Sequence, residues 1–259
     1  MLPLSPAGRR YGFKPSPPDH RDFGVTALPF RVGSLQQLVD LESFCGPVFD
    51  QGDEGSCTAN AGCGNFEYLL RKFRGDQTIL SRAFLYYQER LLDGSLQEGD
   101  CGSTGRSSCK AMRQFGVCSE EVMPYVPGNF SQAPSEQALT DAKARISGAY
   151  HALRSVYDMK SCLASGYCCL IGFTVYASFE DNWPTPGIMP APNKQSEEIL
   201  GGHEVLVIGY DNSKNAFKVR NSWGVNWGEG GNFWMPYQLA ADPDILNEAW
   251  IQHLGAPWK

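Results

Sequence analysis

Cys57 is the residue of this sequence best placed to act as a nucleophile. It follows Gly55 and Ser56 and opens a run with helical periodicity, so Ser56 is expected to be an N-cap and Cys57 to start a helix. The free N–H groups and the dipole of a helix start favour a thiolate, which predicts a lowered pKa for the thiol. Gln51 lies shortly upstream, and its amide is expected to join the Cys57 N–H in one oxyanion site if the intervening loop turns back.

Two later sequence blocks provide a base and a group that orients it. His203 follows Gly201-Gly202 at the start of an expected strand, and a neutral imidazole can take the thiol proton and pass it to a leaving amine. Asn221 ends the next strand after a tight turn, which places it beside His203 across a hairpin. Its side-chain oxygen would accept from the imidazole N–H and fix the tautomer, while Trp223 shields that bond from water.

The elements that must position these residues change character along the chain. Helical patterns come first and strand patterns follow, which predicts an α+β fold with segregated lobes. Expected helices span 57–75, 81–92, 107–115, about 135–145 and 158–164, and expected strands span 167–176, 203–210, 216–220, 231–237 and 248–253.

Composition excludes several other classes of protein. The 259 residues are 42% hydrophobic with a net charge of -6, so the chain can build a core and has no basic surplus for nucleic acid. The longest apolar run is too short to span a membrane, which predicts no membrane partner. Four His, nine Cys and the absence of a C-x-x-C pair give little support for a metal, and no cofactor is expected.

The cysteines and the first residues bear on the compartment of the protein. The first ten residues lack the apolar segment of an export signal, so the sequence favours the cytoplasm without excluding secretion. We therefore interpret the eight cysteines other than Cys57 as reduced packing residues. Cys168 and Cys169 are adjacent and should point to opposite faces of one strand.

The N-terminal segment 1–27 is rich in proline and cannot build a core of its own. We interpret it as an arm that is either a disordered tail or a short inhibitory prosegment lying along a cleft. The remaining residues, 28–259, would form the main domain, with a helical lobe over about 45–150 and a lobe rich in strands over about 151–259.

Three sequence blocks resemble the active-site blocks of papain-like cysteine peptidases. They are DQGDEGSC around Cys57, GGHEVLVIGYD at His203 and VRNSWGVNWGEGG at Asn221. The Cys-to-His gap falls within the roughly 130 to 150 residues expected of that family. The resemblance implies a two-lobe fold, a helical lobe beside an antiparallel barrel-like lobe with the active site in the groove between them. It also implies peptide-bond hydrolysis through a thioester on Cys57, with peptides or proteins as substrates.

The same resemblance assigns substrate-binding residues. Gly102 and Ser103 would pair with the extended backbone of a substrate, and Gly202 and Trp223 would also line the cleft. Glu204 follows the base, at a position that lines the pocket for the second residue on the acyl side of the cleaved bond. A buried carboxylate there would need a cation, so we expect a preference for Arg or Lys unless Glu204 turns to solvent or pairs with a neighbour.

Departures from the family pattern keep other functions open. Glu54 replaces the cysteine that usually lies three residues before the nucleophile, so the usual bridge cannot form, and Thr58 replaces the usual aromatic residue after it. A Cys, His and Asn set also supports acyl transfer to an amine, as in transglutaminase-like enzymes. A catalytically inactive peptide-binding homologue is the other alternative.

Overall fold

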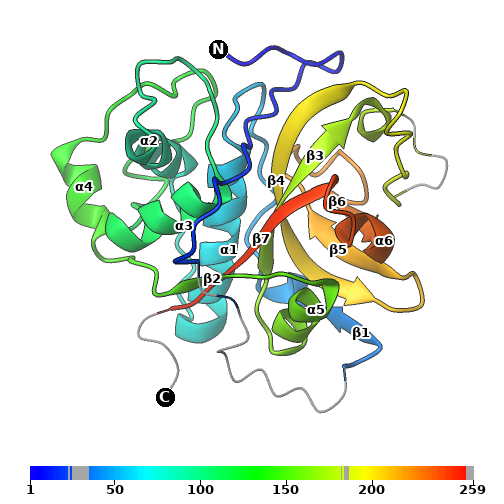
Figure 1. Ribbon diagram of the computed structural model, residues 1–259. Coiled ribbons are helices and arrows are strands. Elements are labelled where there is room, and N and C mark those ends of the chain that lie inside the picture. The colour runs from blue at the N-terminus through cyan, green and yellow to red at the C-terminus, as the bar shows by residue number, and fades with distance from the viewer. Residues whose placement is uncertain (23, 25–34, 182, 184–186, 255–259) are drawn as a thin grey trace.

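Helices and strands occupy different sides of the molecule, as the sequence predicts. The computed structural model describes residues 1–22, 24, 35–181, 183 and 187–254. Most helices lie on one side and an antiparallel sheet on the other, with helix α1 (Cys57–Arg74) along the junction (Figure 1). None of the helices in the described part of the chain is long and apolar enough to cross a membrane.

The helices start and stop at recognisable capping residues. Ser81 and Thr104 cap α2 and α3 by accepting from backbone N–H groups, and Gly75 ends α1 in the left-handed conformation with a φ of 68°. Ser56 was expected to cap α1, but its side chain makes no capping bond and pairs with the Tyr125 hydroxyl instead. The other helices are α2 (Arg82–Leu92), α3 (Gly105–Gln114), α4 (Glu136–Ala142), α5 (Val156–Ala164), α6 (Tyr237–Ala240) and two short 3-10 helices, Glu42–Phe44 and Ala177–Phe179.

A seven-stranded antiparallel sheet forms the second lobe. Its order is β2-β7-β3-β4-β5-β6, with β1 paired to the far end of β4, and the pairing follows an open path instead of closing into a barrel. The hairpin predicted between the strands that carry His203 and Asn221 is present as β4 and β5. The strands are β1 (Leu38–Asp40), β2 (Tyr150–Ala152), β3 (Cys169–Tyr176), β4 (Ile199–Asp211), β5 (Ala216–Arg220), β6 (Asn232–Pro236) and β7 (Leu246–Gln252).

Differences from the sequence prediction lie mainly at element ends. Helices α3 and α5 each begin two residues earlier than expected, and α4 ends three residues earlier. Strand β4 begins at Ile199, because Gly201 and Gly202 continue the pairing with β3. The sequence analysis missed β1, β2 and α6, which are three or four residues long and carry too short a pattern to detect.

Each lobe has its own hydrophobic core, and two adjacent cysteines at the start of β3, Cys168 just before it and Cys169 as its first residue, belong to different cores. Cys168 packs in the core beneath the helices and Cys169 in the core of the sheet lobe, so the predicted opposite orientation is confirmed. All nine cysteines are free. The thiol of Cys168 is next to that of Cys45, and the thiol of Cys169 is next to that of Cys162.

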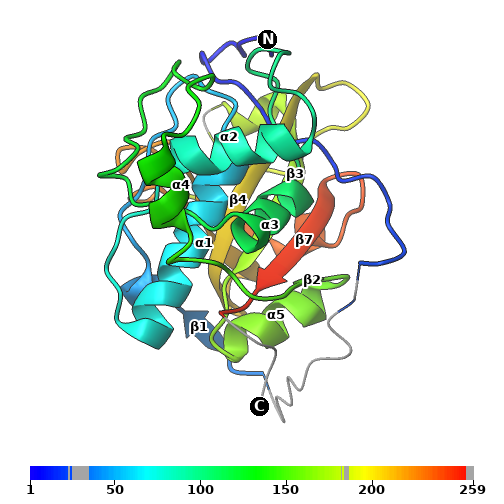
Figure 2. The same ribbon diagram turned by 90° about the vertical axis from the view of Figure 1, so that its left-hand side faces the viewer.

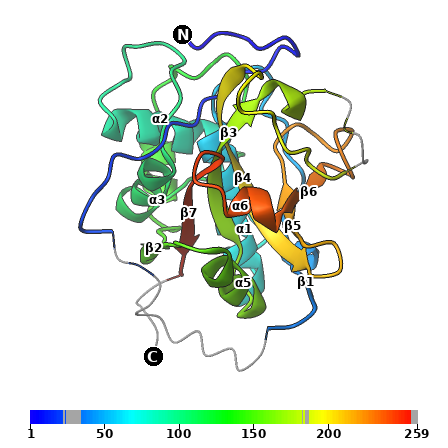
Figure 3. The ribbon, with the colours of Figure 1, turned by 45° about the vertical axis from the view of Figure 1, so that its right-hand side comes forward.

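The N-terminal segment runs through the junction of the two lobes. Residues 1–22, called the arm from here on, pass along the top of the molecule and then descend between the helices and the sheet (Figures 1 and 2). Residues 23 and 25–27 of the predicted 1–27 segment lie outside the described residues. The turned view shows the arm crossing the top of the molecule and then passing down beside α3 (Figure 3).

Candidate active site

Cys57 begins α1 and is completely buried beneath the arm. The backbone N–H groups of Glu204 and Gly12 face its sulfur and favour the thiolate, but burial has the larger effect and raises the pKa of Cys57 to about 12. The lowered pKa expected from the helix start is therefore wrong for this form of the protein. The reason is that Gly12 comes from the arm, and the arm removes water from the site.

His203 and Asn221 form the pair that the sequence predicts. The ring Nε2 of His203 lies 2.7 Å from Asn221 Oδ1, and because an amide oxygen can only accept, Nε2 carries the hydrogen. The neutral ring therefore has its lone pair on Nδ1, which has no hydrogen-bond partner among the described residues. Asn221 Oδ1 also accepts from the N–H of Ser222 at 2.8 Å, which holds the amide in place.

The surroundings of His203 keep its ring neutral. The pKa of His203 is lowered to about 4, mainly because the ring is buried. The hydrogen bond to Asn221 acts in the opposite direction and raises the pKa, and the positive charge of Arg9 lowers it further. Trp223 stacks on the ring with centroids 5.1 Å apart, and only 5% of Trp223 is exposed. Trp223 therefore shields the pair as expected. Arg9 of the arm covers the indole in turn, 4.7 Å from its centroid.

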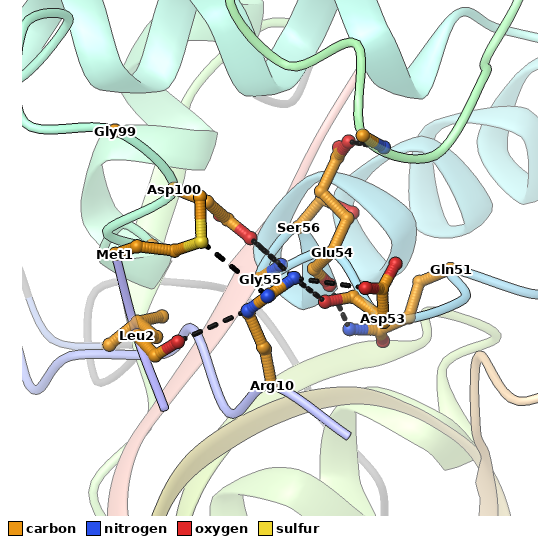
Figure 4. Close-up of polar contacts among 12 residues, drawn as sticks. Met1, Leu2, Arg10, Gln51, Asp53, Glu54, Gly55, Ser56, Gly99 and Asp100 are labelled. Carbon is orange, nitrogen blue, oxygen red and sulfur yellow. Dashed lines mark hydrogen bonds and ion pairs between the residues drawn. The ribbon is translucent and has the colours of Figure 1, made fainter. Parts of the chain in front are cut away.

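Gln51 lies in a loop that turns back toward Cys57. Gly52 has a φ of 64°, and the N–H of Glu54 returns to the carbonyl of Gln51. The Gln51 side chain is buried, accepts from the Ser222 hydroxyl at 2.6 Å, and donates from Nε2 to the carbonyl of Glu54 at 2.8 Å (Figure 4). An amide nitrogen carries two hydrogens, so one N–H remains for an oxyanion.

Glu54 occupies the place of the missing family cysteine. Its side chain is 2% exposed and accepts from the N–H of Gly128 at 2.9 Å. Burial is the main cause that raises its pKa to about 7. A hydrogen bond to the Glu54 carboxyl group thus ties the loop before Cys57 to Gly128.

An extended backbone lies against Gly102, Ser103 and Gly202, and that backbone belongs to the arm. The N–H of Phe13 donates to Gly202, the N–H of Lys14 donates to Ser103, and the N–H of Ser103 donates to Gly12, all at 2.8–2.9 Å. A Cβ on Gly102 would overlap the backbone of Gly12, and a Cβ on Gly12 would overlap the backbone of Gly55. The three residues expected to bind substrate are therefore brought together, and the arm fills their positions.

The sequence analysis missed three acidic residues that contact the arm or the loop 51–56 before Cys57, called the nucleophile loop from here on. Asp100 accepts from the N–H of Gly55 at 2.8 Å, and its backbone carbonyl accepts from Leu2 of the arm (Figure 4). Glu180 accepts from the Tyr11 hydroxyl at 2.5 Å. Glu248 lies beside Glu204, the remaining predicted substrate residue, which is 1% exposed. Nothing local marks these three residues, because sequence-distant contacts define their roles.

The site combines a buried Cys at a helix start with a His whose tautomer is fixed by an Asn, and an extended chain lies against it. This is the type of site expected for a cysteine peptidase. Comparison with known proteins agrees with this class. A sequence profile described as "Papain family cysteine protease" matches residues 37–252, and the chain belongs to that family. The predicted α+β, papain-like fold is therefore confirmed, and the protein is a papain-family cysteine protease, a hydrolase.

Relatives from distant organisms share this architecture. A peptidase C1-like protein of Acanthamoeba polyphaga mimivirus, described as uncharacterized, is 33% identical over 96% of this chain and 88% of its own length. Oryzain gamma chain of Oryza sativa subsp. japonica is 25% identical over 73% of this chain, which spans about half of that relative.

Solved structures give the same result. Xylellain, a cysteine protease from Xylella fastidiosa, superposes with a TM-score of 0.86 at 35% identity, covering 95% of this chain and 96% of that one. Digestive procathepsin L 3 of Tenebrio molitor shares the fold, with a TM-score of 0.73 at 21% identity over 94% of this chain and 76% of its own.

Proposed function

We propose that this protein hydrolyses peptide bonds through a thioester on Cys57, and that the arm keeps it in a latent form. His203 Nδ1 takes the thiol proton and returns it to the leaving amine, and Asn221 holds the ring in the tautomer that makes this possible. The Gln51 amide and the Cys57 N–H stabilise the oxyanion, and water then releases the acyl group. The observation that carries the proposal is the 2.7 Å His203–Asn221 bond, together with the backbone N–H of the next residue, Glu204, which faces the Cys57 sulfur.

The direction of the arm supports the latent form. The leaving amine must lie near His203, so the part of a substrate after the cleaved bond runs toward His203 and Trp223. In the arm, Arg9 and Tyr11 lie on that side, and Phe13 lies on the acyl side. The arm therefore runs opposite to a substrate, and it presents the N–H of Gly12 to the sulfur in place of a carbonyl carbon.

Hydrolysis can be tested on the full chain without knowing the natural substrate. An epoxide that alkylates active-site thiolates should add once, on Cys57, when its reaction is followed by intact mass. Cys57→Ala should abolish both the adduct and the cleavage of peptide reporters, whereas Cys63→Ala, at another buried cysteine of α1, should keep both. Adducts without cleavage would favour the inactive homologue, and transfer of the acyl group to an added amine in preference to water would favour the acyltransferase.

A further inference from the structure

A slot between two buried carboxylates lies on the acyl side of the groove. In the sheet, Gly172 of β3 pairs with Glu204 of β4 on one side and with Glu248 of β7 on the other. Residues directly opposite each other in an antiparallel sheet project to the same face. Because the middle residue is glycine, the row carries a carboxylate at each end and open space at its centre.

The arm fills this space with an aromatic ring. The ring of Phe13 lies where a side chain on Gly172 would project, and Phe13 is 3% exposed. The opposite wall is the first residue of α3, Gly105. A Cβ at Gly105 would lie 2.7 Å from Glu204 Oε2 and 2.6 Å from Glu248 Oε1, so both carboxylates face this corner of the slot.

The charges of the slot are not balanced by any residue that the structure describes. Both carboxylate oxygens of Glu204 are buried without a hydrogen-bond partner. Glu248 accepts from the N–H groups of Gly105 and Ser16, and Glu89, a third carboxylate nearby, accepts from the Thr58 hydroxyl. Within the described ranges, no ion pair involves any of these three glutamates.

The structure contradicts both alternatives that the sequence left open for Glu204. Its side chain does not turn to solvent, and it does not pair with a described neighbour. With the arm in place, burial and then the charges of Glu248 and Glu89 raise its pKa well above the usual range. The described carboxylates do not form a group placed to bind a metal ion. A cationic side chain that enters along the groove would give these carboxylates the partner that the described residues do not provide.

We propose that the slot binds the cationic side chain of a substrate residue, Arg or Lys, at the second position on the acyl side of the cleaved bond, and that Glu204 and Glu248 together select it. A flexible cationic chain entering where the Phe13 ring lies would bring its charge between the two carboxylates. Glu248 adds a second determinant that the sequence analysis did not identify. This inference rests on the proposed peptidase activity.

The test compares substrates that differ only in charge. Fluorogenic dipeptide reporters would share the residue at the cleaved bond and carry Lys or norleucine, or Arg or citrulline, before it. Docking of the arm lowers every rate by the same fraction, so the ratio of kcat/KM values can be measured on the full chain. We expect the charged member of each pair to be preferred by about tenfold or more, as for hydrogen bonds to charged groups.

Substitutions then assign the preference to the slot. Glu204→Gln, which keeps the shape of the side chain, should bring both ratios close to one, and Glu248→Gln should reduce them partly. Glu121→Gln, at an exposed glutamate, should leave them unchanged. Ratios near one in the wild type, or ratios that Glu204→Gln does not change, would overturn the proposal.

Thiol labelling separates this failure from failure of the proposed function. If Cys57 is alkylated and neutral reporters are cleaved without any charge preference, only the slot proposal fails. If no reporter is cleaved and Cys57 is not alkylated even when the arm is displaced by Gly12→Ala, the peptidase proposal fails.

The arm itself provides a second measurement that needs no substrate. The arm should bind the groove more tightly in Phe13→Lys than in Phe13→Met, which has a neutral side chain of similar shape. Cys57 should therefore be alkylated about tenfold more slowly in Phe13→Lys than in Phe13→Met. In a Glu204→Gln background the two variants should react at similar rates. Equal rates in the wild-type background would contradict the slot, and a melting curve for each variant would show that it is folded.

Discussion

The arm meets the groove in two halves that are held by different forces. Before Gly12, the arm is held by charge: Arg10 donates to the carbonyl and carboxylate of Asp53, and Arg9 lies 3.8 Å from Asp50. After Gly12, an uncharged ring covers carboxylates that have no cation. The contact made by Arg9 and Arg10 is matched in charge and partly exposed, whereas the contact made by Phe13 is buried and has no cation beside the carboxylates. Salt should therefore loosen the first half, and protonation should govern the second.

Gly12→Ala, between the halves, should have the largest effect. A Cβ at Gly12 would overlap the backbone oxygen of Gly55, so the arm must leave the nucleophile loop. Water then returns to the site, and the pKa of Cys57 falls from about 12 toward its usual range. We expect alkylation of Cys57 at pH 7.5 to accelerate on the order of a hundredfold or more.

The pH profile of the same reaction gives the control. In the wild type, the raised pKa of Cys57 and the pKa of about 4 for His203 leave both groups neutral near pH 7, so the rate should keep rising up to high pH. In Gly12→Ala it should level off at lower pH. Identical profiles would mean that the arm does not control the thiol.

Phe13→Ala should remove the apolar contact by which the Phe13 ring holds the arm in the slot. Burying a phenylalanine side chain contributes about 1.5–3 kcal/mol, so alkylation should accelerate roughly tenfold to a hundredfold. The gain should not depend on ionic strength, which stopped-flow measurements between low and high salt would show. A gain that disappears at high salt would assign this half to charge as well.

Arg10→Ala should have a smaller effect that depends on salt. The guanidinium bonds are charge-assisted but partly exposed, and exposed ion pairs contribute little, so we expect an acceleration of about threefold to tenfold at low salt. At high salt the difference from the wild type should shrink. Lys14→Ala, at an exposed arm residue, is the matched control and should not change the rate.

The pH dependence of docking should be the smallest effect. Burial raises the pKa of Glu204 while Phe13 covers it, so docking of the arm takes up a proton. This contribution is complete below the ordinary pKa range of a glutamate and is lost as pH rises through the raised value. Glu248 and Glu89 stay beside Glu204 when the arm leaves, so only part of its raised pKa depends on docking. From pH 5 to 8 the arm of the wild type should therefore loosen a few-fold more than that of Glu204→Gln, as measured by the ratio of their alkylation rates.

Other groups that face Glu204 make this matched comparison necessary. They are Cys57 on α1, Glu89 on α2, Cys109 on α3 and Glu248 on β7. Burial raises the pKa of Glu89 to about 8, so it also titrates in this range. Comparing the wild type with Glu204→Gln at each pH isolates Glu204, and a ratio that stays constant with pH would contradict its role.

Local patterns were sufficient for the residues expected to react. Cys57 is marked by a helix start, His203 by an expected strand start and Asn221 by a hairpin end. In the structure His203 and Asn221 are hydrogen-bonded, and the N–H of Glu204, next to His203, faces the Cys57 sulfur. The state of the thiol could not be predicted in the same way. Its pKa depends on Gly12, which is distant in sequence and reaches Cys57 only through the path of the arm.

The slot shows a second limit of the sequence. Glu204 was singled out because it follows His203, but its partner Glu248 is defined by the register of β3 with both β4 and β7. A single polar residue in an expected strand does not reveal which residue lies opposite it. Register depends on packing across the whole sheet, and a shift of one residue would send Glu248 to the other face.

The reversed course of the arm also has a kinetic consequence. With Gly12 presenting its N–H to Cys57, a molecule in this arrangement has no correctly oriented peptide bond of its own arm at the nucleophile. Under the proposed function, a cut in that segment would then be made by a second copy that meets it in the forward direction. The onset of activity in a pure sample would therefore depend on protein concentration to the second order, with a lag that shortens on addition of a trace of already active enzyme.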